Sequence, residues 1–128
     1  MDNVSQEVKK TILLIEDDPL LVKMYQTKFE NEGYQVLVAT DGEEGLKAVI
    51  EGKADLIILD LMMPKISGIE LLTRLQSGKA AKVMPVLVLT NLTQEEEKSK
   101  LMALGVKEYL IKANYTPTQV VDIIRKYI

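Results

Sequence analysis

The sequence predicts an α/β protein: a single domain built on an open, doubly wound, five-stranded parallel sheet. Five short apolar runs alternate with five stretches of helical periodicity, and short connections join them. The runs ILLI, LIIL and VLVL are apolar throughout, which is typical of parallel strands that helices cover on both faces. The expected strands are 11–15, 35–39, 55–59, 85–89 and 108–111.

The helices between these strands have recognisable start signals. Each expected helix is preceded by a residue whose side chain can accept a hydrogen bond from the first helical turn. These residues are Asp18, Asp41, Ser67, Thr93 and Thr116. Pro19 and Pro117 occupy the first positions of the first and fifth helices, and Thr93 with Glu96 predicts a capping box for the fourth.

Glycines and apolar stripes complete the helix predictions. Gly33 and Gly105 are expected to end the first and fourth helices. In the other three helices, apolar residues at helical spacing predict the face that packs against the sheet. These residues are Leu46, Val49 and Ile50 in the second helix, Ile69, Leu71, Leu72 and Leu75 in the third, and Val120, Val121, Ile124 and Ile128 in the fifth.

Composition narrows the class of protein. The 128 residues suit one domain, and 47% hydrophobic with 27% charged residues is typical of a globular protein. Without cysteine there is no disulfide or thiol nucleophile, and without histidine any phosphohistidine must come from another protein. A net charge of −3 argues against a nucleic-acid surface.

No apolar run approaches the roughly 20 residues that span a bilayer, so membrane insertion is not expected. Residues 1–10 are polar and lack the apolar core of a signal peptide. We interpret them as a flexible N-terminal tail before a domain at 11–128, and expect a cytoplasmic location.

Polar residues gather where the strands end. Glu16 and Asp17 follow the first strand, Asp60 the third, Thr90 the fourth and Lys112 the fifth. In doubly wound sheets the carboxyl ends of the strands form the ligand site, so these side chains are expected to converge. An acidic run that opens a helix is often only a cap, and a strand-end Asp is often only a turn residue. Burying an unpaired carboxylate among the apolar neighbours of Asp60, however, is unfavourable by several kcal/mol.

Together these residues suit phosphoryl transfer. Several carboxylates in one pocket repel unless a cation lies among them, and oxygen ligands favour Mg²⁺ or Mn²⁺. An Asp carboxylate such as Asp60 can attack a phosphoryl group while a metal and a lysine neutralise its oxygens. Metal binding alone would leave Lys112 and Thr90 without a role.

Four segments then carry a resemblance. The chain contains, in this order, the segments ILLIEDDP, LIILDLMMPKISG, VLVLTN and EYLIKA. Over 11–128 it resembles the receiver domains of bacterial two-component response regulators, including chemotaxis regulators. The resemblance implies a (βα)5, flavodoxin-like fold with strand order 2-1-3-4-5. It also implies phosphorylation of the domain by a histidine kinase or a histidine phosphotransfer protein.

The resemblance implies a role for each matching residue. Asp60 would be the phosphoacceptor, and the metal would be held by Asp17, Asp60, the Met62 carbonyl and, through water, Glu16. The phosphoryl oxygens would contact Lys112 and Thr90. Thr90 and Tyr109 would move on phosphorylation. This movement would change the surface formed by the fourth helix, the fifth strand and the fifth helix, and with it the affinity of that surface for a target protein or a second copy of the chain. The residues that shape the loop after the acceptor would be Pro64 and Gly68.

The sequence departs from the family pattern at two positions. Ala113 follows Lys112 where the family usually has proline, often after a cis peptide bond, and Asn91 follows Thr90 where a small residue is usual. A cis bond before a non-proline residue is unfavourable by roughly 2.5–4 kcal/mol, so a trans bond or a strained site is expected.

The residues two positions after the acceptor and after the threonine are also informative. Met62 and Leu92 are apolar and cannot orient an attacking water, so we expect a long-lived phosphorylated form. Aspartyl-phosphate phosphatases and mutases have a second Asp at the position of Met62, which argues against a turnover enzyme. The remaining alternative is a docking module that works without phosphorylation. Whether the chain is a stand-alone regulator or part of a longer protein stays open.

Overall fold

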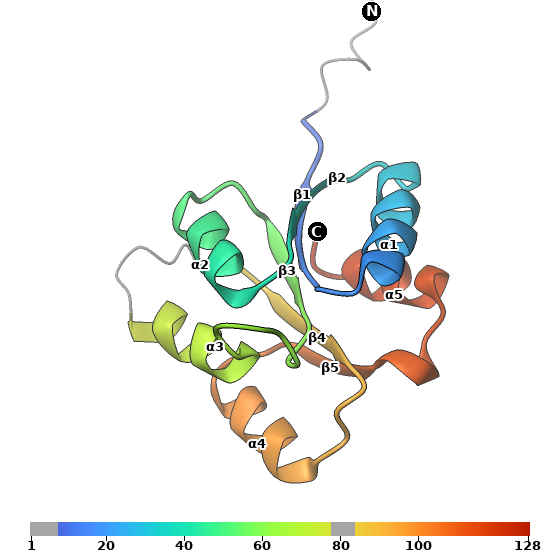
Figure 1. The fold of residues 1–128 in the computed structure, drawn as a ribbon. Helices are drawn as coiled ribbons and strands as arrows, with labels where there is room; N and C mark the ends of the chain where they lie inside the picture. The colour runs from blue at the N-terminus through green and yellow to red at the C-terminus, as the bar shows by residue number, and fades with distance from the viewer. Residues whose placement is uncertain (1–7, 78–83) are drawn as a thin grey trace, which may run out of the picture.

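Strands and helices alternate along the chain, as the sequence predicts. The computed structural model describes residues 8–77 and 84–128. The strands are β1 (Thr11–Ile15), β2 (Gln35–Ala39), β3 (Leu56–Leu59), β4 (Val86–Thr90) and β5 (Glu108–Ile111). The helices are α1 (Pro19–Asn31), α2 (Gly42–Ile50), α3 (Gly68–Ser77), α4 (Glu95–Ala103) and α5 (Pro117–Ile124), with a 3₁₀ helix, η2 (Lys112–Asn114), after β5 (Figure 1).

The five strands form one parallel sheet in the order β2-β1-β3-β4-β5, which confirms the predicted order. β1 lies between β2 and β3, where Ile15 is in register with Ala39 on one side and with Leu59 on the other. The order reverses direction between β1 and β3, so the loops that follow these two strands leave toward opposite faces. This reversal point is where doubly wound sheets form their ligand sites.

Alternating side chains of the strands fill two separate cores. On one face Leu13, Ile57 and Val88 pack against α2, α3 and α4. On the other face Ile12 and Ile58 pack against α1 and α5. Figure 1 shows the same division, with α1 and α5 together on one side of the sheet. The continuous apolar runs in the sequence are explained by this burial on both faces.

Most of the helix signals are confirmed. The Asp18 carboxylate accepts hydrogen bonds from the amides of Leu20 and Leu21, and Asp41 accepts one from Glu44. Ser67 and Thr116 accept equivalent hydrogen bonds at the starts of α3 and α5. At α5 the Gln119 side chain also accepts the Thr116 amide, which completes a capping box. Gly33 and Gly105 follow the ends of α1 and α4, and both have positive φ angles, as expected for glycines that end helices.

The capping box predicted for Thr93 and Glu96 is wrong. α4 begins one residue later, after Gln94, whose side chain makes no capping hydrogen bond. Thr93 therefore lies outside the helix, and Glu96 is not at the third position that a capping box needs. Three glutamates in the first turn, Glu95, Glu96 and Glu97, favour the helix through its dipole instead.

The predicted stripe of α2 includes one residue that does not belong to it. Val49 is 3% exposed and faces the core, whereas Ile50 is 59% exposed. Successive helical residues point about 100° apart, so a residue next to a core position turns away from it. At the C-terminus α5 ends at Ile124, and the predicted core residue Ile128 is half-buried beyond the helix.

Two further expectations concern the N-terminal tail and membrane insertion. Residues 1–7 of the predicted N-terminal tail lie outside the described residues. Within 8–77 and 84–128, no helix combines the length and the apolar character that crossing a bilayer requires.

Candidate functional site

The acidic residues of the site are fixed by the ends of β1 and β3. The amide of Asp60 donates to the carbonyl of Ile15 at 3.0 Å, and the amide of Glu16 donates to the carbonyl of Ala39 at 3.0 Å. The ladder of hydrogen bonds thus continues one residue beyond each strand. As a result the side chains of Glu16, Asp17 and Asp60 start from neighbouring points on one edge of the sheet.

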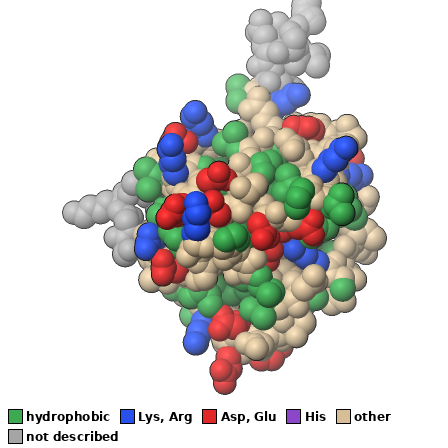
Figure 2. Space-filling model, in the orientation of Figure 1, with side chains coloured by type: hydrophobic (Ala, Val, Ile, Leu, Met, Phe, Trp, Pro, Cys, Tyr) green, Lys and Arg blue, Asp and Glu red, His purple; other side chains and the backbone are tan. Residues whose placement is uncertain are grey.

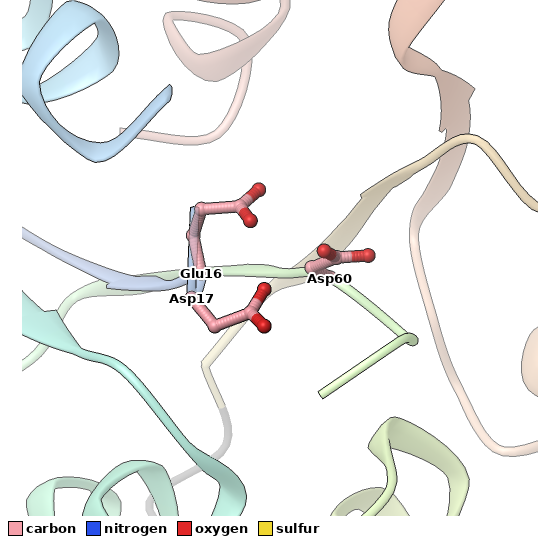
Figure 3. Close-up of side chains that lie close together, drawn as sticks. All are labelled: Glu16, Asp17 and Asp60. Carbon is pink, nitrogen blue, oxygen red and sulfur yellow. The ribbon is translucent and has the colours of Figure 1, made fainter. Parts of the chain in front are cut away.

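The three carboxylates lie close together. One oxygen from each of Glu16, Asp17 and Asp60 lies within 4.8 Å of the others, and Figure 3 shows the carboxylates of Asp17 and Asp60 approaching a common space. Glu16 is 2% exposed and Asp60 is 6% exposed, while Asp17 faces solvent. Such a group of like charges is unfavourable without a cation, and this set of oxygen donors can bind a metal ion.

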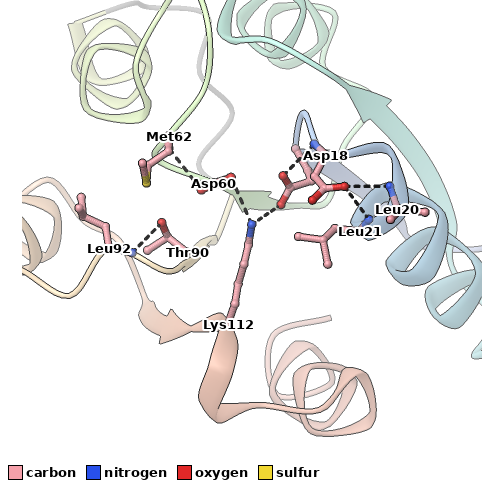
Figure 4. A network of polar contacts seen from close by, with 9 residues as sticks. Asp18, Leu20, Leu21, Asp60, Met62, Thr90, Leu92 and Lys112 are labelled. Carbon is pink, nitrogen blue, oxygen red and sulfur yellow. Dashed lines mark hydrogen bonds and ion pairs between the residues drawn. The ribbon is translucent and has the colours of Figure 1, made fainter.

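Lys112 supplies one positive charge to the cluster. From η2 its ammonium reaches Glu16 Oε1 at 2.6 Å and Asp60 Oδ2 at 3.2 Å (Figure 4). The other oxygen of Glu16 accepts the amide of Asp18 at 3.1 Å. The sequence predicts the proximity of Lys112 to Asp60, but neither contact of Glu16, because both depend on how side chains turn within the pocket.

Burial and these contacts shift the pKa values of Glu16 and Lys112. Burial raises the pKa of Glu16 above its usual range, although the hydrogen bonds from Lys112 and Asp18 act in the opposite direction. Burial also opposes the charge of Lys112, but the carboxylates of Glu16 and Asp60 outweigh it and raise the pKa of Lys112. Lys112 is therefore a permanent cation of the site.

The second oxygen of Asp60 faces the loop that follows β3. Asp60 Oδ1 accepts the amide of Met62 at 3.3 Å, and the Met62 side chain is exposed. Further along this loop the amide of Gly68 lies 3.5 Å from the carbonyl of Leu61. A Cβ at Gly68 would lie 3.0 Å from the Leu61 Cα and 3.4 Å from the Asp60 carbonyl oxygen, so a side chain there would press on the backbone of the loop. Pro64 is exposed in the same loop.

Thr90 and Tyr109 both contact the backbone of Leu92. The hydroxyl of Thr90, which is fully buried, accepts the amide of Leu92 at 3.3 Å. The hydroxyl of Tyr109 donates to the carbonyl of Leu92 at 2.6 Å. The β4–α4 loop therefore joins the strand-end threonine to the aromatic residue on β5. No signal in the sequence reveals this contact, since Leu92 takes part through its backbone alone.

Neither departure from the family pattern introduces a cis peptide bond or a positive φ angle. Within 8–77 and 84–128 there is no cis peptide bond, so Ala113 follows Lys112 through a trans bond. The two residues lie in η2 with Asn114. Of the two expectations for this bond, the trans bond is confirmed. Asn91 is exposed and follows the buried end of β4.

The charges of the cluster suit a divalent cation. Three carboxylates and the Lys112 ammonium leave two negative charges in excess. Asp17 is exposed to solvent, and Asp60 has one oxygen that accepts only a long backbone hydrogen bond. The donors are all oxygens, as hard cations prefer, and the residues present therefore fit a bound Mg²⁺ or a similar ion.

Comparison with known proteins identifies the class. Residues 12–125 match the response regulator receiver domain family. The chain is 38% identical over 113 residues to the alkaline phosphatase synthesis transcriptional regulatory protein PhoP of Bacillus subtilis (strain 168), covering 88% of this chain and 46% of PhoP. It thus spans about half the length of such curated relatives.

Solved structures agree. Chemotaxis protein CheY4 of Vibrio cholerae superposes with a TM-score of 0.84 at 26% identity, covering 94% of this chain and 100% of that one. A receiver domain of a sensor histidine kinase from Pseudomonas aeruginosa PAO1, with a magnesium ion coordinated in its active site cleft, superposes with a TM-score of 0.83 at 20% identity, covering 94% of this chain and 98% of that one. At that identity the second match bears on the fold alone.

The chain belongs to the response regulator receiver domain family. It is a receiver domain of two-component signalling, a class of domain that interacts with histidine kinases. This membership confirms the resemblance that the four sequence segments carry.

Proposed function

We propose that Asp60 is the phosphoacceptor of this receiver domain and takes its phosphoryl group from a phosphohistidine of a histidine kinase or a histidine phosphotransfer protein. The observation that carries the proposal is the surroundings of one carboxylate: Asp60 lies within a cluster of acids and 3.2 Å from the Lys112 ammonium. A cation on one side and acidic metal ligands on the other are what phosphoryl transfer to a carboxylate requires.

In this mechanism an oxygen of Asp60 attacks the phosphorus atom, and the bond between phosphorus and the partner's histidine nitrogen breaks. Lys112 is expected to shift from the carboxylate toward the phosphoryl oxygens, with Glu16 keeping it in place through their 2.6 Å contact. The fully buried Thr90 would offer its hydroxyl to the same oxygens. The domain thereby catalyses its own phosphorylation and dephosphorylation and needs no external substrate other than its donor.

We propose Mg²⁺ as the physiological ion, held by Asp17 and Asp60 directly, by the carbonyl of Met62, and by Glu16 through water. Both oxygens of Glu16 already accept hydrogen bonds, from Lys112 and Asp18, which supports an indirect contact. When bound, such an ion supplies positive charge against the phosphoryl oxygens.

Thr90 and Tyr109 are the proposed switch. When the Thr90 hydroxyl turns toward the phosphoryl group, it loses its hydrogen bond from the Leu92 amide. The carbonyl of the same Leu92 accepts the hydrogen bond of the Tyr109 hydroxyl. Movement at Thr90 is thereby passed to Tyr109 and to the α4-β5-α5 face. We propose that this face then binds a downstream protein or a second copy of the chain, in the cytoplasm, where the phosphoryl donor acts.

Intact mass spectrometry after incubation with acetyl phosphate and Mg²⁺ tests the proposal. The parent protein is expected to gain one phosphoryl group, and Asp60→Asn none. Asp122→Asn, which alters an exposed carboxylate on α5, is the matched control and should be labelled like the parent. Absence of added mass on the parent would instead favour a docking module that works without phosphorylation.

A further inference from the structure

The N-terminus of α2 contacts the loop that follows the acceptor. Residues 61–67 lead from the end of β3 to α3 and contact the start of α2 through Pro64 and Ile66. The loop touches Asp60 directly, because the amide of Met62 donates to Asp60 Oδ1 at 3.3 Å. Whatever fixes the loop therefore also fixes the orientation of that carboxylate.

Gly42, the first residue of α2, is packed tightly against this loop. A Cβ at Gly42 would lie 2.6 Å from the Cβ of Ile66, and still closer to the Ile66 carbonyl oxygen. Backbone atoms cannot be moved aside as the end of a flexible side chain can. The amide of Gly42 also lies 3.4 Å from the carbonyl of Pro64, a long hydrogen bond that continues the same contact. Only a residue without a side chain allows the helix and the loop to approach this closely.

Lys65 links the loop to the start of α2 through two ion pairs. Its ammonium lies 3.4 Å from Asp41 Oδ2 and 3.7 Å from Glu43 Oε2, the residues on either side of Gly42. Figure 2 shows acidic and basic side chains next to one another on this side of the molecule. Lys65 has a φ of +70°, which is unfavourable for a residue with a Cβ, so the loop holds a strained backbone at this point.

The next residue anchors the loop in the core. Ile66 is 6% exposed and belongs to the cluster that packs against α2 and α3. A displacement forced at Gly42 would push on Ile66, and the loop between Ile66 and Asp60 is only five residues long. The displacement would consequently reach Met62 and the orientation of Asp60.

We propose that Gly42 and Lys65 are positioning residues of the phosphorylation site: they hold the 61–67 loop against the start of α2, so that Asp60 and the backbone of Met62 keep the geometry that binds the metal. The proposal rests on the proposed function, because it assumes that Asp60 and Met62 are metal ligands. It assigns to α2, which contributes no side chain to the acidic cluster, a part in that site.

Mg²⁺ titration of Gly42→Ala, followed by NMR, tests the proposal, with urea unfolding of the metal-free protein measured in parallel. We expect Mg²⁺ to bind roughly 10- to 100-fold more weakly, as when an outer support of a metal site is lost. The matched control is Gly45→Ala in the same helix, where a Cβ would lie 2.8 Å from Cδ1 of Ile15, the end of a flexible side chain. Gly45→Ala should bind Mg²⁺ as the parent does.

Lys65→Gly covers the case in which Gly42→Ala does not fold. The Lys65 side chain is 57% exposed and glycine suits a positive φ, so this variant keeps the fold. We expect Mg²⁺ to bind roughly two- to fivefold more weakly, within the range of an exposed ion pair, and Lys65→Arg to restore the affinity. Removing a positive charge would otherwise strengthen cation binding, so the sign of the change is diagnostic.

Two results would overturn the proposal: a folded Gly42→Ala that binds Mg²⁺ as tightly as the parent, or a Lys65→Gly that binds it equally well or more tightly. Neither result would be confused with failure of the proposed function. If the function itself is wrong, the parent and Gly45→Ala will also fail to bind Mg²⁺ or to accept a phosphoryl group.

Discussion

The Lys112 ammonium lies 2.6 Å from Glu16 Oε1, closer than the 3.2 Å that separates it from Asp60 Oδ2. The two side chains of this ion pair are only 11% and 3% exposed, and they join the end of β5 to the end of β1. Lys112 thus has a second, buried partner besides the proposed phosphoacceptor. If Asp60 is phosphorylated as proposed, we expect this partner to keep the ammonium in the pocket while Asp60 changes its charge and its contacts.

Replacing Lys112 by methionine should weaken folding and strengthen metal binding. Without the ammonium, Glu16 is left buried and unpaired among like charges, which costs about 3–5 kcal/mol of unfolding free energy. The same change leaves three carboxylates uncompensated, so Mg²⁺ should bind more tightly and restore part of the lost stability. Urea unfolding with and without Mg²⁺ measures both effects.

Lys107→Met is the control for this experiment, because Lys107 is exposed and lies just before β5. It should change neither quantity appreciably. A Lys112→Met protein as stable as the parent in the absence of Mg²⁺ would show that the buried ion pair with Glu16 has no role in folding.

Tyr109→Phe should separate the switch from the metal site. The substitution removes the hydrogen bond to the Leu92 carbonyl, which is expected to lower the unfolding free energy by about 0.5–1.5 kcal/mol. The hydroxyl does not contact the acidic cluster in the structure, so Mg²⁺ affinity and labelling by acetyl phosphate should stay as in the parent. Loss of labelling in this variant would contradict the placement of Tyr109 behind the site.

The strands and the positions of the candidate site residues can be predicted from the sequence because both depend on local patterns. Continuous apolar runs identify strands buried on both faces, and the residue after each run falls at one edge of the sheet. The order of the runs is therefore enough to predict that Asp60, Thr90 and Lys112 lie close together. The trans bond before Ala113 also follows from a local energy, since a non-proline cis bond is unfavourable.

The errors and omissions depend on contacts that no local pattern encodes. Thr93 has the right side chain to cap α4, but the helix starts one residue later, where glutamates interact with its dipole. Ile50 is apolar and adjacent to a core residue, yet points away from the sheet. The contact of Gly42 with Ile66 joins residues distant in sequence, and a glycine in a helical stretch carries no sign of what approaches it.

Asp41 should make stability depend on acid pH. The hydrogen bond from the Glu44 amide, aided by Lys65, holds the pKa of Asp41 below its usual range. A lowered folded-state pKa contributes stability above the ordinary aspartate pKa of about 3.9, and this contribution is lost as the pH falls through the folded-state value. Asp41→Asn keeps a capping side chain but removes the charge.

The urea midpoints of the parent and Asp41→Asn should therefore differ near neutral pH and converge in acid, because the parent loses the contribution that the variant never had. A carboxyl titration by NMR gives the pKa of Asp41 independently. A difference between the two proteins that stays constant from neutral to acid pH would exclude this role of the Asp41 charge.

The lifetime of the phosphorylated form should depend on Met62. Met62 is 63% exposed beside the proposed acceptor, and its apolar side chain cannot orient a water molecule. Met62→Asn should shorten the half-life of the phosphorylated protein severalfold, whereas Met62→Leu, which keeps an apolar side chain, should not. Loss of phosphoryl mass with time after removal of acetyl phosphate gives both rates. A parent half-life of seconds would contradict the expectation of a long-lived form.

Reduction by borohydride after phosphorylation tests the central claim most directly, because it converts an aspartyl phosphate to homoserine and leaves a free carboxylate unchanged. The protein is incubated with acetyl phosphate and Mg²⁺, reduced, digested and sequenced by mass spectrometry. Our account predicts homoserine at position 60 and at no other aspartate, and none when Mg²⁺ is withheld. Unmodified Asp60 under conditions that phosphorylate the protein elsewhere, for example at Asp17, would contradict it.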